Sequence, residues 1–172
     1  MENKVFTIHR GKQSLSDKLL DAREKLIKEL KSTEHRLEEV SELNGVLYIN
    51  DSKATNLITT KDSIRCLKRP VVWIVNSTPH DRDFMLLNKM VEYKVKSIVI
   101  MGDSAEDIKK ELKPLVDVIV QTSSLDEAIQ EAKGLASKGD CVLFSPSCPP
   151  PPEYNNYVEM GVAFKQKVGT LG

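Results

Sequence analysis

The sequence has no excess of either charge, few aromatic residues and no long apolar run. Its 25 acidic side chains match its 25 basic ones, so no net positive field attracts a polyanion, and we expect no nucleic-acid partner. No apolar stretch approaches the ~20 residues that span a bilayer, and the first residues lack the apolar core of a signal peptide. Cys66, Cys141 and Cys148 are an odd number of cysteines without paired spacing, which favours free thiols in a reducing compartment. We therefore expect a cytoplasmic protein with no membrane partner.

A helix and a hairpin are expected within the first 50 of the 172 residues. Leucine and alanine recur every three or four residues from Leu15 to Leu30, with lysine and glutamate on the other face, which predicts an amphipathic helix. Two apolar-rich segments, 37–43 and 46–50, are joined by Asn44-Gly45, a strong signal for a two-residue hairpin turn. The sheet is therefore expected to begin with an antiparallel pair.

Beyond the hairpin, continuous apolar runs alternate with amphipathic stretches. The runs fit strands that are buried on both faces, and they comprise residues 71–75, 98–101, 118–120 and 141–144. Helices are expected from Ser104 through Leu112, over 125–135 behind a Ser124–Glu127 capping box, and along a stripe from Tyr154 to Val168. This alternation predicts a Rossmann-like, three-layer α/β domain with a mostly parallel sheet.

Ligands of such sheets bind beyond the carboxyl ends of the strands, which directs attention to the loops there. The loop 50–56, Asn-Asp-Ser-Lys-Ala-Thr-Asn, combines a carboxylate, an ammonium and two hydroxyls, which suits a ribose or a phosphate. A helix cap by Asp51 or Ser52 is the simpler alternative. The glycines and the Gly-Lys-Ser/Thr ending of a Walker loop are absent. Arg36 could stack on or fork to a ligand, or it could pair on the surface with its glutamate neighbours at positions 34 and 38.

Two other segments also allow a functional and a structural interpretation. His80, Asp81 and Asp83 could hold a metal, but nothing in their spacing directs them to one centre, which favours a solvated turn and no metal site. The proline run 149–152 could be a polyproline ligand for an adaptor domain, although a stiff lead-in to the last helix is the simpler reading.

These residues together resemble the C-terminal domain of the Mur ligase family, most closely of its D-glutamate-adding members. His-Arg at 35–36 followed by a hairpin and the loop 50–56 is similar to a signature of those members. Residues 143–148, Leu-Phe-Ser-Pro-Ser-Cys, with Asn156-Tyr157 and Gly161, look like the family's Ser-Pro-Ala-Cys-Ala-Ser loop and last helix. The resemblance covers residues 34–172, and residues 1–33 resemble the end of the family's central domain more loosely.

The resemblance implies an ATP-dependent acid–amino-acid ligase of peptidoglycan synthesis that works through an acyl phosphate. ATP and magnesium are the implied cofactors, and ADP or ATP with D-glutamate or a related anion are the implied ligands. Arg36 and Asp51 would contact the adenosine part, and Lys53 would be the catalytic residue facing the phosphates, where a cation suits developing phosphoryl charge. The residues implied on the amino-acid side are Thr55, His80 and Tyr154.

Two of the three substrate loops depart from the family pattern. The family's Gly-Gly-x-Asp-Lys-Gly loop reads Asn-Ser-Thr-Pro-His-Asp at 76–81, which places His80 where the family has a lysine contact for the amino acid. In the third loop Pro149-Pro150 replace Ala-Ser, which removes a serine contact, and the following aromatic is retained as Tyr154. The nucleotide side is kept and the glutamate side is altered.

Three hypotheses follow from the match and its departures. The first is a ligase domain that acts with a protein supplying the ATP-binding and UDP-binding domains, because no phosphate-loop motif is present in these residues. The second is a non-catalytic binding or regulatory module derived from that domain. The third is an independent enzyme with new chemistry at His80, Asp81 and Asp83.

Overall fold

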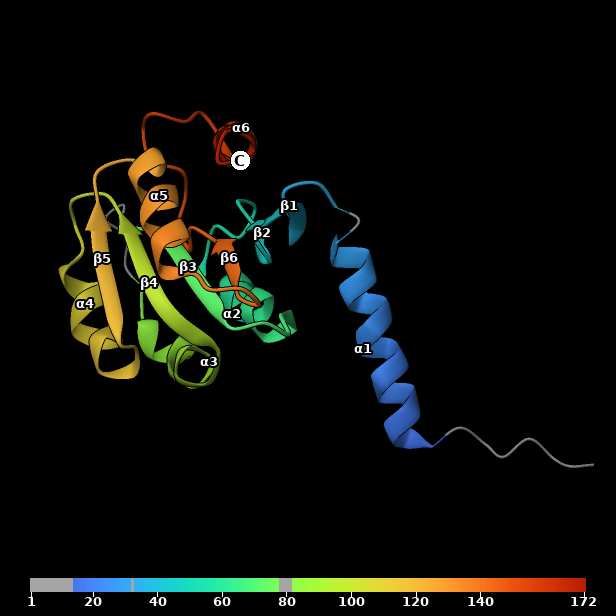
Figure 1. The fold of residues 1–172 in the computed structure, drawn as a ribbon. Coiled ribbons are helices and arrows are strands. Elements are labelled where there is room, and N and C mark those ends of the chain that lie inside the picture. Colours follow the sequence, from blue (N-terminus) through green and yellow to red (C-terminus); the bar gives the residue numbers. More distant parts are fainter. Residues whose placement is uncertain (1–13, 32, 78–81) are drawn as a thin grey trace, which may run out of the picture.

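A six-stranded sheet with the order β1-β2-β6-β3-β4-β5 organises the chain (Figure 1). Its strands are β1 (Glu38–Leu43), β2 (Val46–Asn50), β3 (Val71–Asn76), β4 (Val95–Met101), β5 (Val118–Thr122) and β6 (Cys141–Phe144). β1 and β2 pair antiparallel and all other pairs are parallel, which confirms the expected fold. The computed structural model describes residues 14–31, 33–77 and 82–172, with residues 26–31 described by their backbone alone.

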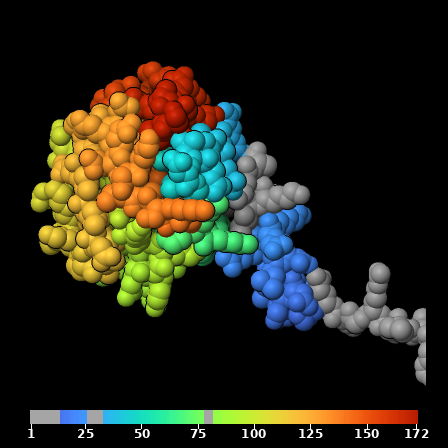
Figure 2. All heavy atoms as spheres, in the orientation of Figure 1, coloured from blue at the N-terminus to red at the C-terminus, as the bar shows by residue number. Residues whose placement is uncertain are grey.

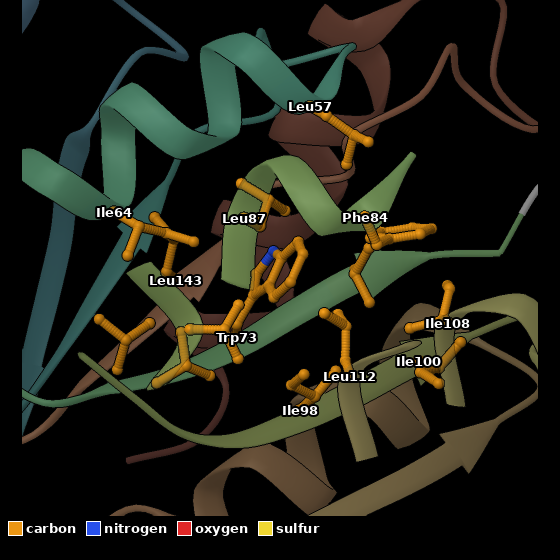
Figure 3. Packing of buried hydrophobic residues seen from close by; sticks show 14 of the residues in the cluster. Leu57, Ile64, Trp73, Phe84, Leu87, Ile98, Ile100, Ile108, Leu112 and Leu143 are labelled. Atoms are coloured by element: carbon orange, nitrogen blue, oxygen red, sulfur yellow. The ribbon is translucent and has the colours of Figure 1, made fainter. Parts of the chain in front are cut away.

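Helices cover both faces of this sheet. α2 (Leu57–Cys66), α3 (Asn88–Lys94) and α4 (Glu106–Leu112), with the short 3-10 helices η1 (Phe84–Leu87) and η2 (Lys113–Leu115), cover one face. α5 (Leu125–Leu135) and α6 (Tyr157–Gly169) cover the other. Because side chains alternate along a strand, Trp73 of β3 packs into the first core, whereas its neighbours Val72 and Ile74 pack into the second. Figure 3 shows the Trp73 ring near Leu87, Phe84 and Leu143.

The first helix, α1 (Leu15–Lys31), projects from the sheet domain beside β1 (Figures 1 and 2). This confirms the helix expected from Leu15 to Leu30. Leu15 and Leu19, at the start of its predicted apolar face, are 75% and 63% exposed. No helix in the described part of the chain has both the length and the apolar character needed to cross a membrane.

The predicted hairpin turn and capping box are confirmed, whereas the predicted start of one helix is wrong. The hairpin turn at Asn44 and Gly45 has positive φ at both residues, 52° and 78°, as this turn requires. In the capping box, Ser124 Oγ accepts from the backbone N–H of Glu127 at 3.2 Å. α4 starts two residues later than expected, at Glu106, and has no side-chain cap.

The last helix starts later than its apolar stripe indicates. Asn156 is its N-cap, since Asn156 Oδ1 accepts from the backbone N–H groups of Val158 and Glu159. Tyr154 therefore lies before the helix, in a turn where its backbone N–H donates to the Pro151 carbonyl at 3.0 Å. The proline run 149–152 leads into this turn rather than into the first turn of the helix.

Candidate functional site

Three loops lie side by side at the carboxyl edge of the sheet, because β2, β6 and β3 are adjacent parallel strands. Backbone hydrogen bonds join the loop after β2 to the loop after β6, from Asp51 N–H to the Phe144 carbonyl at 2.8 Å and from Ser147 N–H to the Ala54 carbonyl at 2.9 Å. The loop after β6 is joined in turn to the end of β3, from Asn76 N–H to the Pro146 carbonyl at 3.1 Å. The structure thus brings the sequence-predicted loops together.

Asp51 is fully buried at the centre of this edge. Its Oδ1 accepts from the backbone N–H of Leu37 at 3.2 Å, and its Oδ2 accepts from the hydroxyl of Ser145 at 2.9 Å. Burial raises the pKa of Asp51 to about 6, against the opposing effects of its hydrogen bonds and of Arg36. The carboxylate therefore holds three chain segments in register.

Arg36 makes its ion pair with this buried aspartate. Its Nε lies 3.8 Å from Asp51 Oδ1, and its side chain is 13% exposed. The alternative of a surface pair with the neighbouring glutamates is wrong, because it is His35, not Arg36, whose ring nitrogens lie within 4 Å of Glu34 and Glu38. Arg36 is thus the more exposed partner of an ion pair whose other member, Asp51, is fully buried.

The loop 50–56 does not cap a helix through Asp51 or Ser52, so that alternative is wrong. The cap of α2 is Asn56, whose Oδ1 accepts from the backbone N–H of Thr59 at 3.0 Å. Between the strand and this cap the chain makes a turn, in which the Ala54 N–H donates to the Asp51 carbonyl at 2.8 Å.

This turn buries Asp51, Ser52 and Ala54 and leaves Lys53 exposed. The Lys53 ammonium lies 5.9 Å from the ring centroid of Tyr157, at the start of α6, a cation–π distance. Thr55 is partly exposed just beyond. The loop thus presents an exposed cation beside an aromatic ring, which suits an anionic ligand.

The aromatic beside Lys53 is one that the sequence analysis did not assign a role. Tyr154, the predicted contact, is half-buried and packs against the core beneath α5 and α6, where burial raises the pKa of its phenol. Tyr157 was noted only as part of the last helix. It is the first residue of α6, directly after the N-cap Asn156.

His35 and Gly161 are two further residues that sequence reasoning did not assign. His35 is 4% exposed, and its Nδ1 lies 3.0 Å from Asn50 Nδ2. α6 crosses this pair at Gly161, where a Cβ would overlap Ser52 Oγ and His35 Nδ1. The absence of a side chain at position 161 therefore allows α6 to pack closely against the loop 50–56.

The loop after β3 is described only at its two ends. His80 and Asp81 lie outside the described residues, so the predicted amino-acid contact of His80 remains a prediction. Asp83 caps η1, with its Oδ1 accepting from the Met85 N–H at 3.0 Å. Arg82 donates to the Asn76 carbonyl at 2.8 Å and lies over the Phe84 ring, which places a guanidinium at the mouth of this loop.

Comparison with known proteins decides the family. Residues 35–148 match the family described as Mur ligase, glutamate ligase domain. The chain belongs to this Mur ligase domain family. It is 38% identical over 162 residues to the UDP-N-acetylmuramoylalanine–D-glutamate ligase of Christiangramia forsetii, covering 92% of this chain and 36% of that protein. The same ligase of Caldanaerobacter subterraneus is 37% identical, over 88% of this chain and 34% of its own length.

The fold of the Mur ligase domain also has a counterpart among solved structures. A MurF ligase from Thermotoga maritima, crystallised in complex with ADP, aligns with a TM-score of 0.52 and 15% identity. The alignment covers 83% of this chain and 33% of the MurF chain. At this identity the match supports the fold of the chain, and the 172 residues correspond to only part of each relative.

Proposed function

We propose that this chain is the nucleotide- and amino-acid-contacting domain of an ATP-dependent ligase that adds D-glutamate to UDP-N-acetylmuramoylalanine. The observation that carries the proposal is the loop 50–56, which buries Asp51 against Arg36 and exposes Lys53 two residues later. An ion-paired arginine and an exposed lysine suit the polar and anionic parts of a nucleotide. Identity to two D-glutamate ligases over most of the chain supports the same reaction.

In this proposal each residue has a distinct role. Arg36, held by Asp51, contacts the adenosine part, and Lys53 neutralises charge that develops on the transferred phosphoryl group. Thr55, which is partly exposed next to Lys53, contacts the amino acid, and the family resemblance implies His80 and Tyr154 as further contacts. The side chains of Arg36 and Lys53 suit the polar and anionic parts of ATP, and no group of three His, Cys, Asp or Glu side chains among the described residues could hold a metal. In this proposal Arg36 and Lys53 contribute positioning and charge.

The remaining machinery would come from the rest of such a ligase. The chain spans 36% and 34% of the two ligases to which it is similar. The leucines at positions 15, 19 and 20 of α1 are all more than half exposed, and exposed apolar groups of this kind mark contact with further protein. We infer that α1 faces protein that supplies the ATP-binding and UDP-binding sites.

A second candidate is a non-catalytic binding or regulatory module. The observation that favours it is Pro149-Pro150, which stand where the family has Ala-Ser in the loop after β6. Proline removes a backbone N–H and fixes φ, so this loop offers fewer donors to an amino-acid carboxylate.

A chimeric ligase separates the two candidates. This chain replaces its matching segment in the Christiangramia forsetii ligase, and phosphate release is measured with and without D-glutamate. The ligase proposal predicts D-glutamate-dependent turnover that Lys53→Met lowers by about 100-fold or more, as loss of a transition-state charge contact does. Lys68→Met, at an exposed lysine after α2, is the control and leaves turnover unchanged. A folded chimera that binds ADP without turnover would favour the binding module.

A further inference from the structure

A chain of buried hydroxyl groups links two of the loops of the candidate site. It begins at Asp51, whose Oδ2 accepts from the Ser145 hydroxyl at 2.9 Å. The Thr60 hydroxyl, on α2, lies 2.9 Å from Ser145 Oγ, and the Ser147 hydroxyl donates to Thr60 Oγ1 at 3.0 Å. All four residues are fully buried, so these hydroxyls have no solvent to replace their partners.

The Asp51 carboxylate sets the direction in which these hydroxyl groups donate their hydrogen bonds. Because the Ser145 proton points to Asp51, Ser145 Oγ must accept from Thr60, and Thr60 in turn accepts from Ser147. Each hydroxyl therefore donates once toward the anion, an arrangement in which successive hydrogen bonds polarise one another. Thr60 is the middle member, and it belongs to neither loop.

Ser147, at the end of this series of hydroxyls farthest from Asp51, has an uncommon backbone conformation. Ser147 has a φ of 64°, which residues other than glycine adopt infrequently. Its N–H donates to the Ala54 carbonyl at 2.9 Å while its hydroxyl reaches Thr60, so it is fixed to the loop after β2 and to α2 at once. From Ser147 the backbone runs on toward the prolines and Tyr154, the predicted amino-acid side.

We propose that Thr60 is a positioning residue that couples the nucleotide side of the site, Arg36–Asp51, to the amino-acid side, Ser145–Tyr154. This inference rests on the proposed function for the identity of the two sides. A ligand that binds Arg36 changes how strongly the Asp51 carboxylate attracts the Ser145 proton. This change alters the hydrogen bonds that Ser145 and Thr60 make, and through them the conformation of Ser147. The two sides therefore respond together to one ligand.

Trp73 provides a built-in reporter for the test. It is the only tryptophan in the sequence, and its indole N–H donates to the Ser145 carbonyl at 2.8 Å. In a ¹⁵N-labelled sample of this chain, the indole resonance and the Ser147 amide report the loop after β6, and the Lys53 amide reports nucleotide binding. ADP is the probe, and it is titrated into the wild type, Thr60→Val and Thr60→Ser.

The expected result is that ADP shifts all three resonances in the wild type. In Thr60→Val the Lys53 response persists, and the indole and Ser147 responses are lost. Thr60→Ser, which retains the hydroxyl, restores them. Thr122→Val is the control, because Thr122 is a buried threonine whose hydroxyl bonds the Ile100 carbonyl in β4. If Thr60→Val does not fold, Ser147→Ala breaks the same chain and takes its place.

Two other outcomes have separate meanings. Full-sized indole and Ser147 responses in Thr60→Val would overturn the coupling and leave the proposed function intact. If ADP moves no resonance in the wild type, the proposed function fails, and the positioning role of Thr60 is then decided without ligand. In that case hydrogen exchange at the Ser147 amide should accelerate by about tenfold in Thr60→Val but not in Thr60→Ser, and an unchanged rate would overturn the inference.

Discussion

Replacing Gly161 by alanine tests how closely α6 packs against the loop 50–56. A Cβ at this position would overlap Ser52 Oγ and His35 Nδ1, and it would lie 3.0 Å from Asn50 Nδ2. Ser52, His35 and Asn50 are all buried, so none of them can swing aside into solvent. Overpacking a core in this way costs about 1–3 kcal/mol, whereas alanine in place of glycine inside a helix recovers about 1 kcal/mol. The net expectation is a loss of up to about 2 kcal/mol in unfolding free energy, or more if α6 must shift.

The assay is thermal and urea unfolding of Gly161→Ala beside Gly134→Ala. Gly134 lies in α5 with nothing within 4 Å of its Cβ position, so alanine there should stabilise the chain by up to about 1 kcal/mol. For a chain of this size 1 kcal/mol corresponds to roughly 2–4 °C in Tm. The two variants should therefore shift Tm in opposite directions. Equal, positive shifts would refute the close contact between α6 and the loop 50–56.

Three further predictions concern buried and half-buried groups. Burial raises the pKa of Asp51 from 3.8 to about 6, so the folded state binds this proton more tightly than the unfolded state does. The contribution of Asp51 to stability therefore falls as pH rises from about 4 to about 6, by roughly 3 kcal/mol in total. Asp51→Asn should remove this pH dependence from the unfolding free energy measured in urea between pH 4 and 7. An unchanged pH dependence would contradict the assignment. Burial raises the pKa of the Cys141 thiol to about 12, so in the folded chain a thiol reagent at pH 8 should modify the partly exposed Cys66 and spare Cys141; mass spectrometry of the labelled peptides would disprove this if both reacted at one rate. The Lys94 ammonium donates to three backbone carbonyls at the C-terminal end of α2, so Lys94→Met should lower the unfolding free energy by about 1–3 kcal/mol; a loss well below this range would show that the contacts are dispensable.

Most of the sheet was predictable because its signals are local. The run Val71–Val75 is apolar at every position, as a strand covered on both faces requires, and Asn44-Gly45 supplies the two positive φ angles of the hairpin turn. A helix after β2 was expected only through a cap by Asp51 or Ser52, four or five residues before the actual cap at Asn56. The threonines and serine of α2 interrupt the apolar spacing that marks a helix, so the pattern does not locate α2 itself. Its stability comes from Leu57 and Ile64 packing on the sheet, a tertiary effect that overrides local pattern.

The candidate site was predictable in its residues but not in its geometry. The loop 50–56 and Arg36 stand out from composition and from the resemblance to the family. The partners of Asp51, by contrast, lie 14 and 94 residues away, at Leu37 and Ser145, so no local pattern indicates that its carboxylate is buried. The contact of Gly161 with His35 is hidden for the same reason, because α6 meets the loop only in the folded chain.

Titration of ADP into this chain, followed by thermal unfolding, tests the central claim most directly. At about 100 times its dissociation constant, ADP should stabilise the fold by roughly 2.7 kcal/mol, and this gain should be lost in Lys53→Ala and Arg36→Ala. Absence of stabilisation in the wild type, or a gain of equal size in both variants, would contradict the assignment of a nucleotide site to Arg36, Asp51 and Lys53.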